Sequence, residues 1–374
     1  MKILIAGDFV PYRRTAVHVE AGDYSCLDEV KPIVQAADYA IVNFESPVVT
    51  REAQPIDKTG PNLRCTEQAM ECVSQAGFNC VTLANNHFRD YGQIGVEDTV
   101  EACRKYGLDY VGGGATQEEA RRIIYKELDG QTLAIINICE NEWSIATKEY
   151  GGSNPLDVVH VSRAIKEAKN NTDYLLLIIH GGTEMYNLPT PRMKETYRFF
   201  IEQGADAIVN HHQHCYSGYE VYQDKPIVYG LGNFCFDKTK AVSNPLWETG
   251  YVVTIDFGSS IRFELHPYTQ CTEENAKVCF IRDRAEFNHS IEELNAIISN
   301  DSLLTEHFSK MAQRNGSQTN TLIIPYNNRV LTALNSRGLF PSLIKHKKIK
   351  SLLAHSRCEA HRDVMIENLI HRLQ

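Results

Sequence analysis

The sequence predicts a layered α/β fold with a mixed sheet or two sheets, followed by a helical C-terminal appendage. Strand-like apolar runs alternate with helix-like segments over the first 284 of the 374 residues, which is the order of α/β crossovers. Hairpin signals follow later, at residues 129–130 and 258–260, and add antiparallel pairs. Residues 285–374 are mostly helical in pattern, so we expect the appendage to begin near residue 285.

The expected strands are runs of apolar residues that are either continuous or alternate with polar ones. They lie at residues 2–6, 39–43, 79–84, 110–111, 125–128, 132–139, 174–179, 207–210, 227–229, 251–257 and 261–267. The runs 125–128 and 132–139 flank Asp129-Gly130, and the last two runs flank a Gly-Ser-Ser turn, so each pair predicts a hairpin.

The expected helices are segments with apolar residues three to four positions apart or with capping residues at their ends. They lie at residues 27–35, 66–75, 96–106, 116–123, 161–169 and 192–202. For the segment 66–75, Thr66 is the expected N-cap and Gly77 the expected stop.

The charge of the chain is unevenly distributed. Residues 1–284 carry 27 basic and 39 acidic side chains, a net charge of -12, while residues 285–374 carry 11 and 8, a net charge of +3. An acidic body disfavours nucleic acid as a partner, because phosphate contacts supply most of that affinity. The sequence contains no stretch of about 18 apolar residues, so we expect no transmembrane span. The first apolar run is too short for a signal peptide. We therefore expect a cytoplasmic protein, soluble or peripheral to the inner face of the membrane.

The 11 cysteines are scattered and include no Cys-x-x-Cys pair. Several lie in apolar runs, for example Cys80 and Cys139. This pattern favours reduced, mostly buried thiols over a disulfide framework or a cysteine zinc site.

Five of the expected strands lead directly into polar side chains that can bind a metal ion. These segments are Gly7-Asp8, Asn43-Phe44-Glu45, Asn85-Asn86-His87, His180-Gly181-Gly182-Thr183-Glu184 and His211-His212-Gln213-His214. Ligands of α/β sheets bind at the carboxyl ends of the strands, so these side chains should converge. Each residue alone could be a turn former or a packed side chain, but three imidazoles in four residues serve no packing need.

The donor types predict the class of metal. Carboxylates, an amide carbonyl and imidazoles form a mixed oxygen and nitrogen set, which suits Mn, Fe, Zn, Co or Mg and not a thiolate site. A carboxylate placed between two ions can bridge them, and two ions can activate water and hold a phosphoryl oxygen. The sequence therefore predicts one or two divalent metal ions as cofactors.

The combination of motifs resembles the CapA family, capsule-synthesis proteins associated with poly-γ-glutamate, which looks like a branch of the calcineurin-like metallophosphoesterases. The motifs that carry the resemblance, besides the five above, are Asp90-Tyr91-Gly92, Gly204-Ala205-Asp206 and Tyr229-Gly230-Leu231-Gly232-Asn233-Phe234. The resemblance covers about residues 1–257. It implies a four-layer α/β/β/α sandwich with a dinuclear site at one edge. The sequence pattern sets the bounds of this domain at residues 1–284, followed by the basic helical appendage 285–374, which is not part of the shared core.

The resemblance also implies roles for individual residues. The implied metal ligands are Asp8, Glu45, Asn86, His180, His212 and His214. His87 would be the general acid at the leaving group, and Asp8 and Glu184 would take part in catalysis. We further expect Asn43, Arg64 and Asn233 to bind substrate.

One position departs from the pattern of the wider superfamily. Val10 stands where that superfamily has the histidine of Asp-x-His, which leaves the number of ions open. His211 occupies a position that is often glycine there and is not expected to be a ligand.

Three functions remain open from the sequence. The leading one is a metal-dependent phosphoesterase linked to capsule or other cell-surface polymer synthesis, acting on a phosphorylated small molecule or a polymer precursor. The second is a non-hydrolytic accessory protein that binds a polymer or glycan in the same pocket. The third is an acid/base enzyme without metal, such as an isomerase.

The C-terminal residues 337–374 allow two interpretations. They carry 8 basic and 3 acidic side chains together with regularly placed apolar residues. Such a segment either packs on the acidic body or makes peripheral contact with an anionic membrane or a partner protein.

Overall fold

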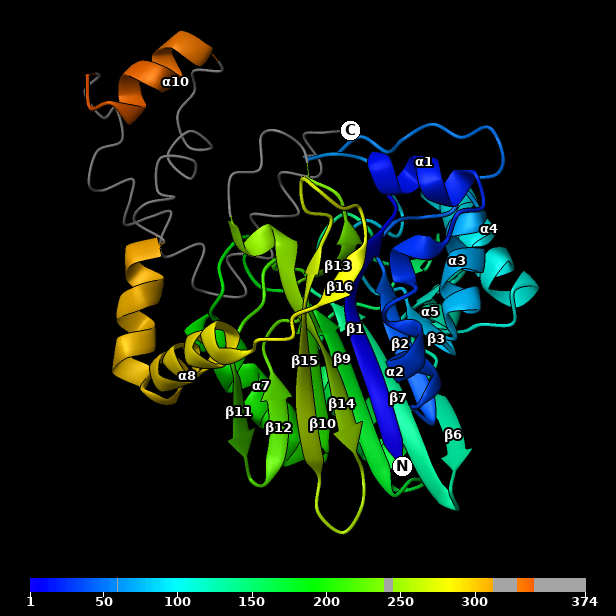
Figure 1. The fold of residues 1–374 in the computed structure, drawn as a ribbon, viewed down its shortest axis with the longest axis vertical. Helices are drawn as coiled ribbons and strands as arrows, with labels where there is room; N and C mark the ends of the chain where they lie inside the picture. The colour runs from blue at the N-terminus through cyan, green and yellow to red at the C-terminus, as the bar shows by residue number, and fades with distance from the viewer. Residues whose placement is uncertain (59, 239–244, 312–327, 340–374) are drawn as a thin grey trace. The chain divides into compact units, whose positions relative to one another are not determined.

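The computed structural model describes residues 1–58, 60–238, 245–311 and 328–339 (Figure 1). The chain divides into two compact units, Met1–Thr305 and Glu306–Gln374. The first unit contains both large sheets and all the strand ends discussed above.

The larger sheet has eight strands in the order β16-β15-β14-β1-β2-β3-β4, with β13 also paired to β1. Its strands are β1 (Lys2–Val10), β2 (Tyr39–Phe44), β3 (Cys80–Thr82), β4 (Asp109–Val111), β13 (Asn233–Phe236), β14 (Thr249–Asp256), β15 (Arg262–Gln270) and β16 (Val278–Phe280). Strands β1 to β4 are parallel, whereas β14 to β16 are antiparallel to their neighbours. The expected order of early crossovers and later antiparallel pairs is therefore present in one sheet.

The second sheet has six strands in the order β11-β12-β10-β9-β7-β6. They are β6 (Ile124–Leu128), β7 (Gln131–Cys139), β9 (Tyr174–His180), β10 (Ala207–His211), β11 (Tyr219–Tyr222) and β12 (Lys225–Val228). The short strands β5 (Gly113–Gly114) and β8 (Gly152–Ser153) form a separate pair. Strands β7, β9 and β10 are parallel, so their carboxyl ends lie at one edge.

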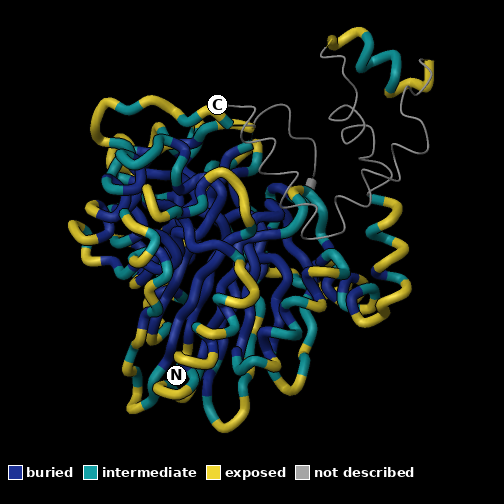
Figure 2. Tube along the Cα trace, turned by 180° about the vertical axis from the view of Figure 1, so that it is seen from behind, coloured by how far each residue is buried: buried dark blue, intermediate teal, exposed yellow. Residues whose placement is uncertain are grey.

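Helices cover the outer face of each sheet. The described helices of the first unit are α1 (Arg14–Glu20), η1 (Ser25–Leu27), α2 (Lys31–Gln35), α3 (Gln68–Ala76), α4 (Gly92–Lys105), α5 (Gln117–Ala120), α6 (Val158–Lys169), α7 (Pro191–Gln203), η2 (Pro245–Glu248) and α8 (Ala285–Ser299). In β1, Ile3 and Ile5 belong to the core between the two sheets, while Leu4 belongs to the core under α1–α4. Figure 2 shows the strands as the buried interior. The expected four-layer α/β/β/α sandwich is confirmed.

Some predicted boundaries were wrong for identifiable reasons. The segment predicted as a helix over 27–35 shares only Leu27 with η1 and then contains α2, which begins at Lys31 because Pro32 fits only the first turn of a helix. Helix α3 begins at Gln68 and not at Thr66, but Gly77 ends it in the left-handed conformation (φ 99°), as expected. The short strands β5, β8, β11, β13 and β16 and the helix α1 were not predicted.

The C-terminal part of the chain is helical where the structure describes it. Helix α8 packs against β11 through Ile291 and Leu294, within the first unit, and α10 (Arg329–Ser336) lies in the second unit. The division of the chain at residue 284 stays a prediction. Residues 340–374, which hold most of the basic tail, lie outside the described residues.

No helix in the described ranges is both long enough and apolar enough to cross a lipid bilayer. Cys80 and Cys139 are buried free thiols, as expected.

Candidate metal centre

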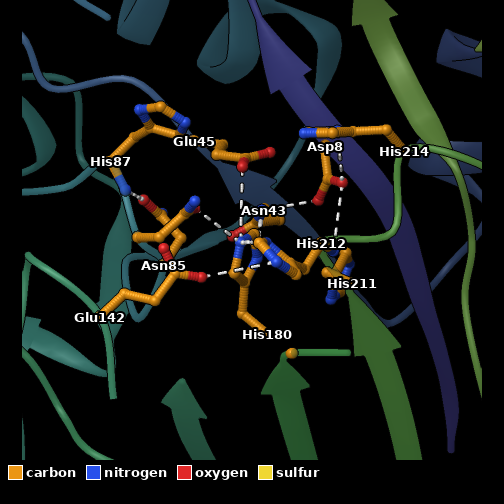
Figure 3. A network of polar contacts seen from close by, with 12 residues as sticks. Asp8, Asn43, Glu45, Asn85, His87, Glu142, His180, His211, His212 and His214 are labelled. Atoms are coloured by element: carbon orange, nitrogen blue, oxygen red, sulfur yellow. Dashed lines mark hydrogen bonds and ion pairs between the residues drawn. The ribbon is translucent and has the colours of Figure 1, made fainter. Parts of the chain in front are cut away.

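Strand ends from both sheets meet at one place (Figure 3). Asp8 lies near the end of β1, and Glu45 directly follows β2 in the eight-stranded sheet. His180 is the last residue of β9, and His212 directly follows β10 in the six-stranded sheet. All four side chains are buried, with at most 4% of any residue exposed. The convergence expected from the strand ends is therefore observed for residues that are far apart in the sequence.

One group of possible metal ligands is centred on His180. Its Nε2 atom lies 3.4 Å from Glu45 Oε1, 3.1 Å from His212 Nδ1 and 3.1 Å from Asn86 Oδ1. Burial lowers the pKa of both imidazoles well below the usual range, and neighbouring histidines add to the effect. Neutral imidazole is the form that binds metal ions, so both rings are in the required state.

A second group shares Glu45 and adds Asp8 and His214. His214 Nδ1 lies 3.7 Å from Asp8 Oδ2, and Asp8 Oδ1 accepts a hydrogen bond of 2.7 Å from the Asn43 amide. Burial raises the pKa of Asp8 to about 6, and the charge of Glu45 adds to this. Burial alone would lower the pKa of His214, but the charges of Glu45 and Asp8 hold it above the usual value.

Glu45 tests whether these residues fit a metal ion. The side chain is fully buried, and neither carboxylate oxygen has a hydrogen-bond partner among the described residues. Burial raises the pKa of this carboxyl group, because the charged form is poorly solvated there. A buried carboxylate without compensation is costly, and a cation would compensate it. The mixed oxygen and nitrogen donors fit one or two divalent ions, with Glu45 shared between the two groups.

The backbone at the two later histidines has an unusual conformation. His212 and His214 have φ angles of 93° and 55°, in the left-handed region that non-glycine residues rarely adopt. This conformation brings one ring into each ligand group. His211 points elsewhere, with its Nε2 atom 3.0 Å from the carbonyl oxygen of Ala6.

His87 stands beside the ligand groups with its Nδ1 atom occupied. This atom lies 2.6 Å from Asp90 Oδ2 and 3.2 Å from Lys58 Nζ. Lys58 also forms an ion pair with Asp90, whose carboxylate accepts a hydrogen bond of 2.7 Å from the Leu63 amide. The arrangement leaves Nε2 as the ring atom that can face a substrate. The sequence reasoning assigned no role to Lys58 or Asp90, although Asp90 follows His87 by three residues and lies within a quoted motif.

The predicted substrate-binding amides contact the ligands themselves. Besides its bond to Asp8, the Asn43 amide nitrogen lies 3.3 Å from His180 Nδ1. Asn233 Oδ1 lies 2.9 Å from His214 Nδ1, and its amide donates to the His214 carbonyl at 3.2 Å. Both asparagines are buried and contact side chains of the candidate ligand groups. Their role in substrate binding stays a prediction.

Two further predicted residues lie outside the ligand groups. Arg64 is exposed, with its guanidinium carbon 5.6 Å from the centre of the Tyr91 ring. Glu184 is also exposed, and its charge contributes to the raised pKa of Glu45 after the larger effect of burial. The roles assigned to Arg64 and Glu184 stay predictions.

Glu142 is a carboxylate at the centre that the sequence reasoning missed. Its Oε1 atom lies 3.5 Å from His212 Nε2 (Figure 3). Its side chain is 38% exposed, but partial loss of solvent around the carboxylate raises its pKa, and the charge of Glu184 adds to this. Glu142 lies three residues after β7, on a segment whose path no local sequence signal predicts.

Position 10 supplies no ligand. Val10 is 1% exposed and packs in an apolar cluster with Leu63, Phe236 and Trp247. The group of Asp8 and His214 therefore has no donor from this position.

Comparisons with known proteins agree with the motif resemblance. The Capsule biosynthesis protein CapA of Bacillus anthracis is 36% identical over 218 residues, which cover 56% of this chain and 53% of that protein. The PGA biosynthesis protein CapA of Bacillus subtilis (strain 168) is 33% identical over 222 residues, covering 59% and 58%. The chain thus spans about half the length of the curated relatives it matches.

Among solved structures, the 5'-nucleotidase from Candida albicans SC5314 is similar at a TM-score of 0.44 and 11% identity, covering 84% of this chain and 57% of that one. A likeness this distant carries no argument about chemistry. The family model described as Bacterial capsule synthesis protein PGA_cap, in contrast, matches residues 2–238, well over half of the chain. The protein therefore belongs to the PGA_cap family of bacterial capsule synthesis proteins.

Proposed function

We propose that this chain is a metal-dependent phosphoesterase that acts in the synthesis of a capsule or another cell-surface polymer. The observation that carries the proposal is Glu45, a buried carboxylate without a hydrogen-bond partner that is shared by two groups of possible ligands. A structural role explains neither the missing partner nor the shared position.

The residues of the centre would act as metal ligands and as a general acid. One ion would be held by Glu45, Asn86, His180 and His212, and a second by Asp8, Glu45 and His214. Bound divalent ions supply activation of water and neutralisation of phosphoryl charge. His87, with Nδ1 held by Asp90, would deliver a proton from Nε2 to the leaving oxygen.

The place in polymer synthesis is proposed from the names of the relatives, which refer to capsule and PGA biosynthesis. The substrate would be a phosphorylated small molecule or a phosphorylated precursor of the polymer. We also propose peripheral contact of residues 337–374 with an anionic membrane or a partner protein on the cytoplasmic side. Vesicle flotation of the chain with and without that segment tests this contact, and equal flotation would refute it.

Elemental analysis of the purified protein, paired with a panel of phosphoesters in the presence of Mn²⁺, tests the proposed activity. We expect at least one bound ion per chain and metal-dependent turnover. Glu45→Gln should lose most of the metal and lower turnover at least about 100-fold. Glu220→Gln is a matched control, because Glu220 lies on β11 and pairs with Arg198 away from the ligand groups. A wild-type protein without stoichiometric metal would refute the proposal, and would leave the metal-independent acid/base enzyme as the interpretation to test.

A second candidate is a non-hydrolytic accessory protein that binds a polymer in the same place. Val10 favours it, because the buried apolar side chain leaves the group of Asp8, Glu45 and His214 without a fourth side-chain donor from position 10. The Probable polyglutamine synthesis accessory protein Rv0574c of Mycobacterium tuberculosis, 24% identical over 215 residues, is named as an accessory protein. Polymer binding that survives chelation, without turnover of any phosphoester, would decide for this candidate.

A further inference from the structure

Arg89 is a partly buried guanidinium that has no carboxylate partner in the described part of the chain. Its Nε atom is buried without a hydrogen-bond partner, and its Cζ atom lies 3.8 Å from the centre of the Tyr150 ring. Burial lowers the pKa of Arg89, and the hydroxyl of Tyr150 offsets only part of this effect. Other arginines of the body, such as Arg51 and Arg198, pair with carboxylates.

Arg89 lies on the same short segment as two residues of the metal centre. Asn86 and His87 precede it, and the Cα atoms of His87 and Arg89 are at most about 7.6 Å apart, because consecutive Cα atoms are separated by 3.8 Å. The Arg89 amide donates to Ser144 Oγ at 3.0 Å, and this hydroxyl donates to the Asn86 carbonyl at 2.7 Å. The segment of Arg89 is therefore hydrogen-bonded to the segment that follows β7.

The segment that follows β7 also reaches the metal centre. It carries Glu142, whose Oε1 atom lies 3.5 Å from His212 Nε2, and eight residues later it carries Tyr150. Arg89 thus lies two residues after His87, and Tyr150 lies eight residues after Glu142, on the two segments that carry these residues of the centre.

An uncompensated charge of this kind requires an explanation. Removing a guanidinium from water without an anion is unfavourable, and stacking on a tyrosine offsets only part of the loss. The two Nη nitrogens of a guanidinium whose Cζ atom lies over an aromatic ring can still bind the two oxygens of a carboxylate or phosphate. Arg64, also near an aromatic ring, needs no such partner because it is exposed to water.

We propose that Arg89, held on the Tyr150 ring, binds a second anionic group of the substrate, a carboxylate or phosphate attached to the same molecule as the phosphoryl group at the metal centre. The inference rests on the proposed function and deepens it. It narrows the substrate class to phosphoesters that carry another anion.

Calorimetric titration with non-hydrolysable phosphonates tests the inference in the Mn²⁺-loaded protein. The probes are 4-phosphonobutyrate, butane-1,4-diphosphonate and butylphosphonate, which carry a carboxylate, a second phosphonate and no second anion, respectively. We expect the wild type to bind at least one of the first two about 10- to 100-fold more tightly than the third, since hydrogen bonds between charged groups contribute this much. The tighter of the two identifies the preferred anion.

The variants separate charge from packing. Arg89→Met should remove the preference for the doubly anionic probes and leave butylphosphonate binding unchanged, while Arg89→Lys should retain part of the preference. Arg104→Met is the matched control, because Arg104 also lies near an aromatic ring, Tyr110, but is already paired with Glu119. Circular dichroism and thermal unfolding check that the variants fold.

The outcomes distinguish this inference from the proposed function. If the wild type hydrolyses a phosphoester and Arg89→Met keeps the full preference for the doubly anionic probes, the anion site is overturned and the proposed phosphoesterase is not. An absence of turnover with a preference that depends on Arg89 would overturn the phosphoesterase and support the anion site. A wild type that binds all three probes equally would overturn the anion site.

Discussion

Replacing Asp8 by asparagine should stabilise the metal-free protein near neutral pH, although it removes a metal ligand. Asp8 is 1% exposed, and burial followed by the charge of Glu45 raises its pKa from 3.8 to about 6. A carboxyl group with a higher pKa in the folded state binds more protons when folded, so stability falls as the pH rises through this interval. Above about pH 6, the ionised Asp8 therefore opposes folding in the absence of a cation.

The size of the effect follows from the pKa interval and from one hydrogen bond. The interval from 3.8 to about 6 is a little over two pKa units, which corresponds to about 3 kcal/mol at pH 7. Asparagine can still accept the bond from the Asn43 amide. Its own amide would face the His212 N–H, which now donates to Asp8 at 3.3 Å, at a loss of about 1 kcal/mol. We therefore expect Asp8→Asn to raise the free energy of unfolding by about 2 kcal/mol at pH 7.

Urea unfolding in the presence of a chelator measures this difference. The advantage of Asp8→Asn should shrink as the pH falls from about 6 towards 3.8, because Asp8 becomes protonated in the folded wild type. With Mn²⁺ at about 100 times its dissociation constant, the wild type gains about 2.7 kcal/mol and the order of stabilities should reverse. A chelated Asp8→Asn variant that is less stable than the wild type at neutral pH would refute the reasoning.

Three further changes test other parts of the structure. Burial alone would raise the pKa of Asp98, but hydrogen bonds from Thr50 and Arg51 lower it. The ionised carboxylate therefore stabilises the folded state at pH values above the pKa that Asp98 has in the unfolded chain. Asp98→Asn should cost about 1–3 kcal/mol in urea unfolding at pH 7, and less as the pH falls. Gly112 has a φ of +81°, and a Cβ atom there would lie 2.0 Å from Asn137 Oδ1, so Gly112→Ala should lower the free energy of unfolding by about 3 kcal/mol. Asp90→Asn should lower turnover about 100-fold without loss of metal, because His87 loses the carboxylate 2.6 Å from Nδ1.

Each of these predictions has a control. Gly130 also has a positive φ of +71° but would place a Cβ atom in open space, so Gly130→Ala should cost only about 1 kcal/mol, and an equal cost at Gly112 would contradict the steric argument. Loss of metal from Asp90→Asn would show that Asp90 is structural. A stability deficit of Asp98→Asn that grows with acidity would contradict the sign of the pKa shift.

The convergence of the candidate ligands could be predicted because each lies near the end of a strand, or directly after one, that the sequence defines clearly. The apolar run before His180 fixes a buried strand, and its last residue must then lie at the carboxyl edge of the sheet. The same reasoning applies to Asp8 and Glu45, which end or follow strands buried along nearly their whole length. Strand direction and the position of the sheet edge are therefore sufficient to predict that these side chains lie close together.

Contacts made by loops could not be predicted in the same way. Lys58 reaches His87 from 29 residues earlier in the chain, and Glu142 reaches His212 from a segment without regular structure. Asn43 was expected to bind substrate, but its amide contacts Asp8 and His180, and its position at a strand end does not tell whether an amide faces a substrate or a neighbouring side chain. The direction of such side chains depends on which segments fold over the site, and no local pattern encodes that.

The origin of the ligands in two different sheets has a consequence for folding. Asp8 belongs to one sheet and His212 to a segment that follows the other, and 204 residues separate them along the chain. The centre is therefore complete only after the two sheets have docked, and contacts of such long range form slowly. An ion bound there would link the two sheets through its ligands. Amide hydrogen exchange in both sheets should therefore slow together on metal binding. Metal affinity would then report how firmly the two halves of the sandwich are held together.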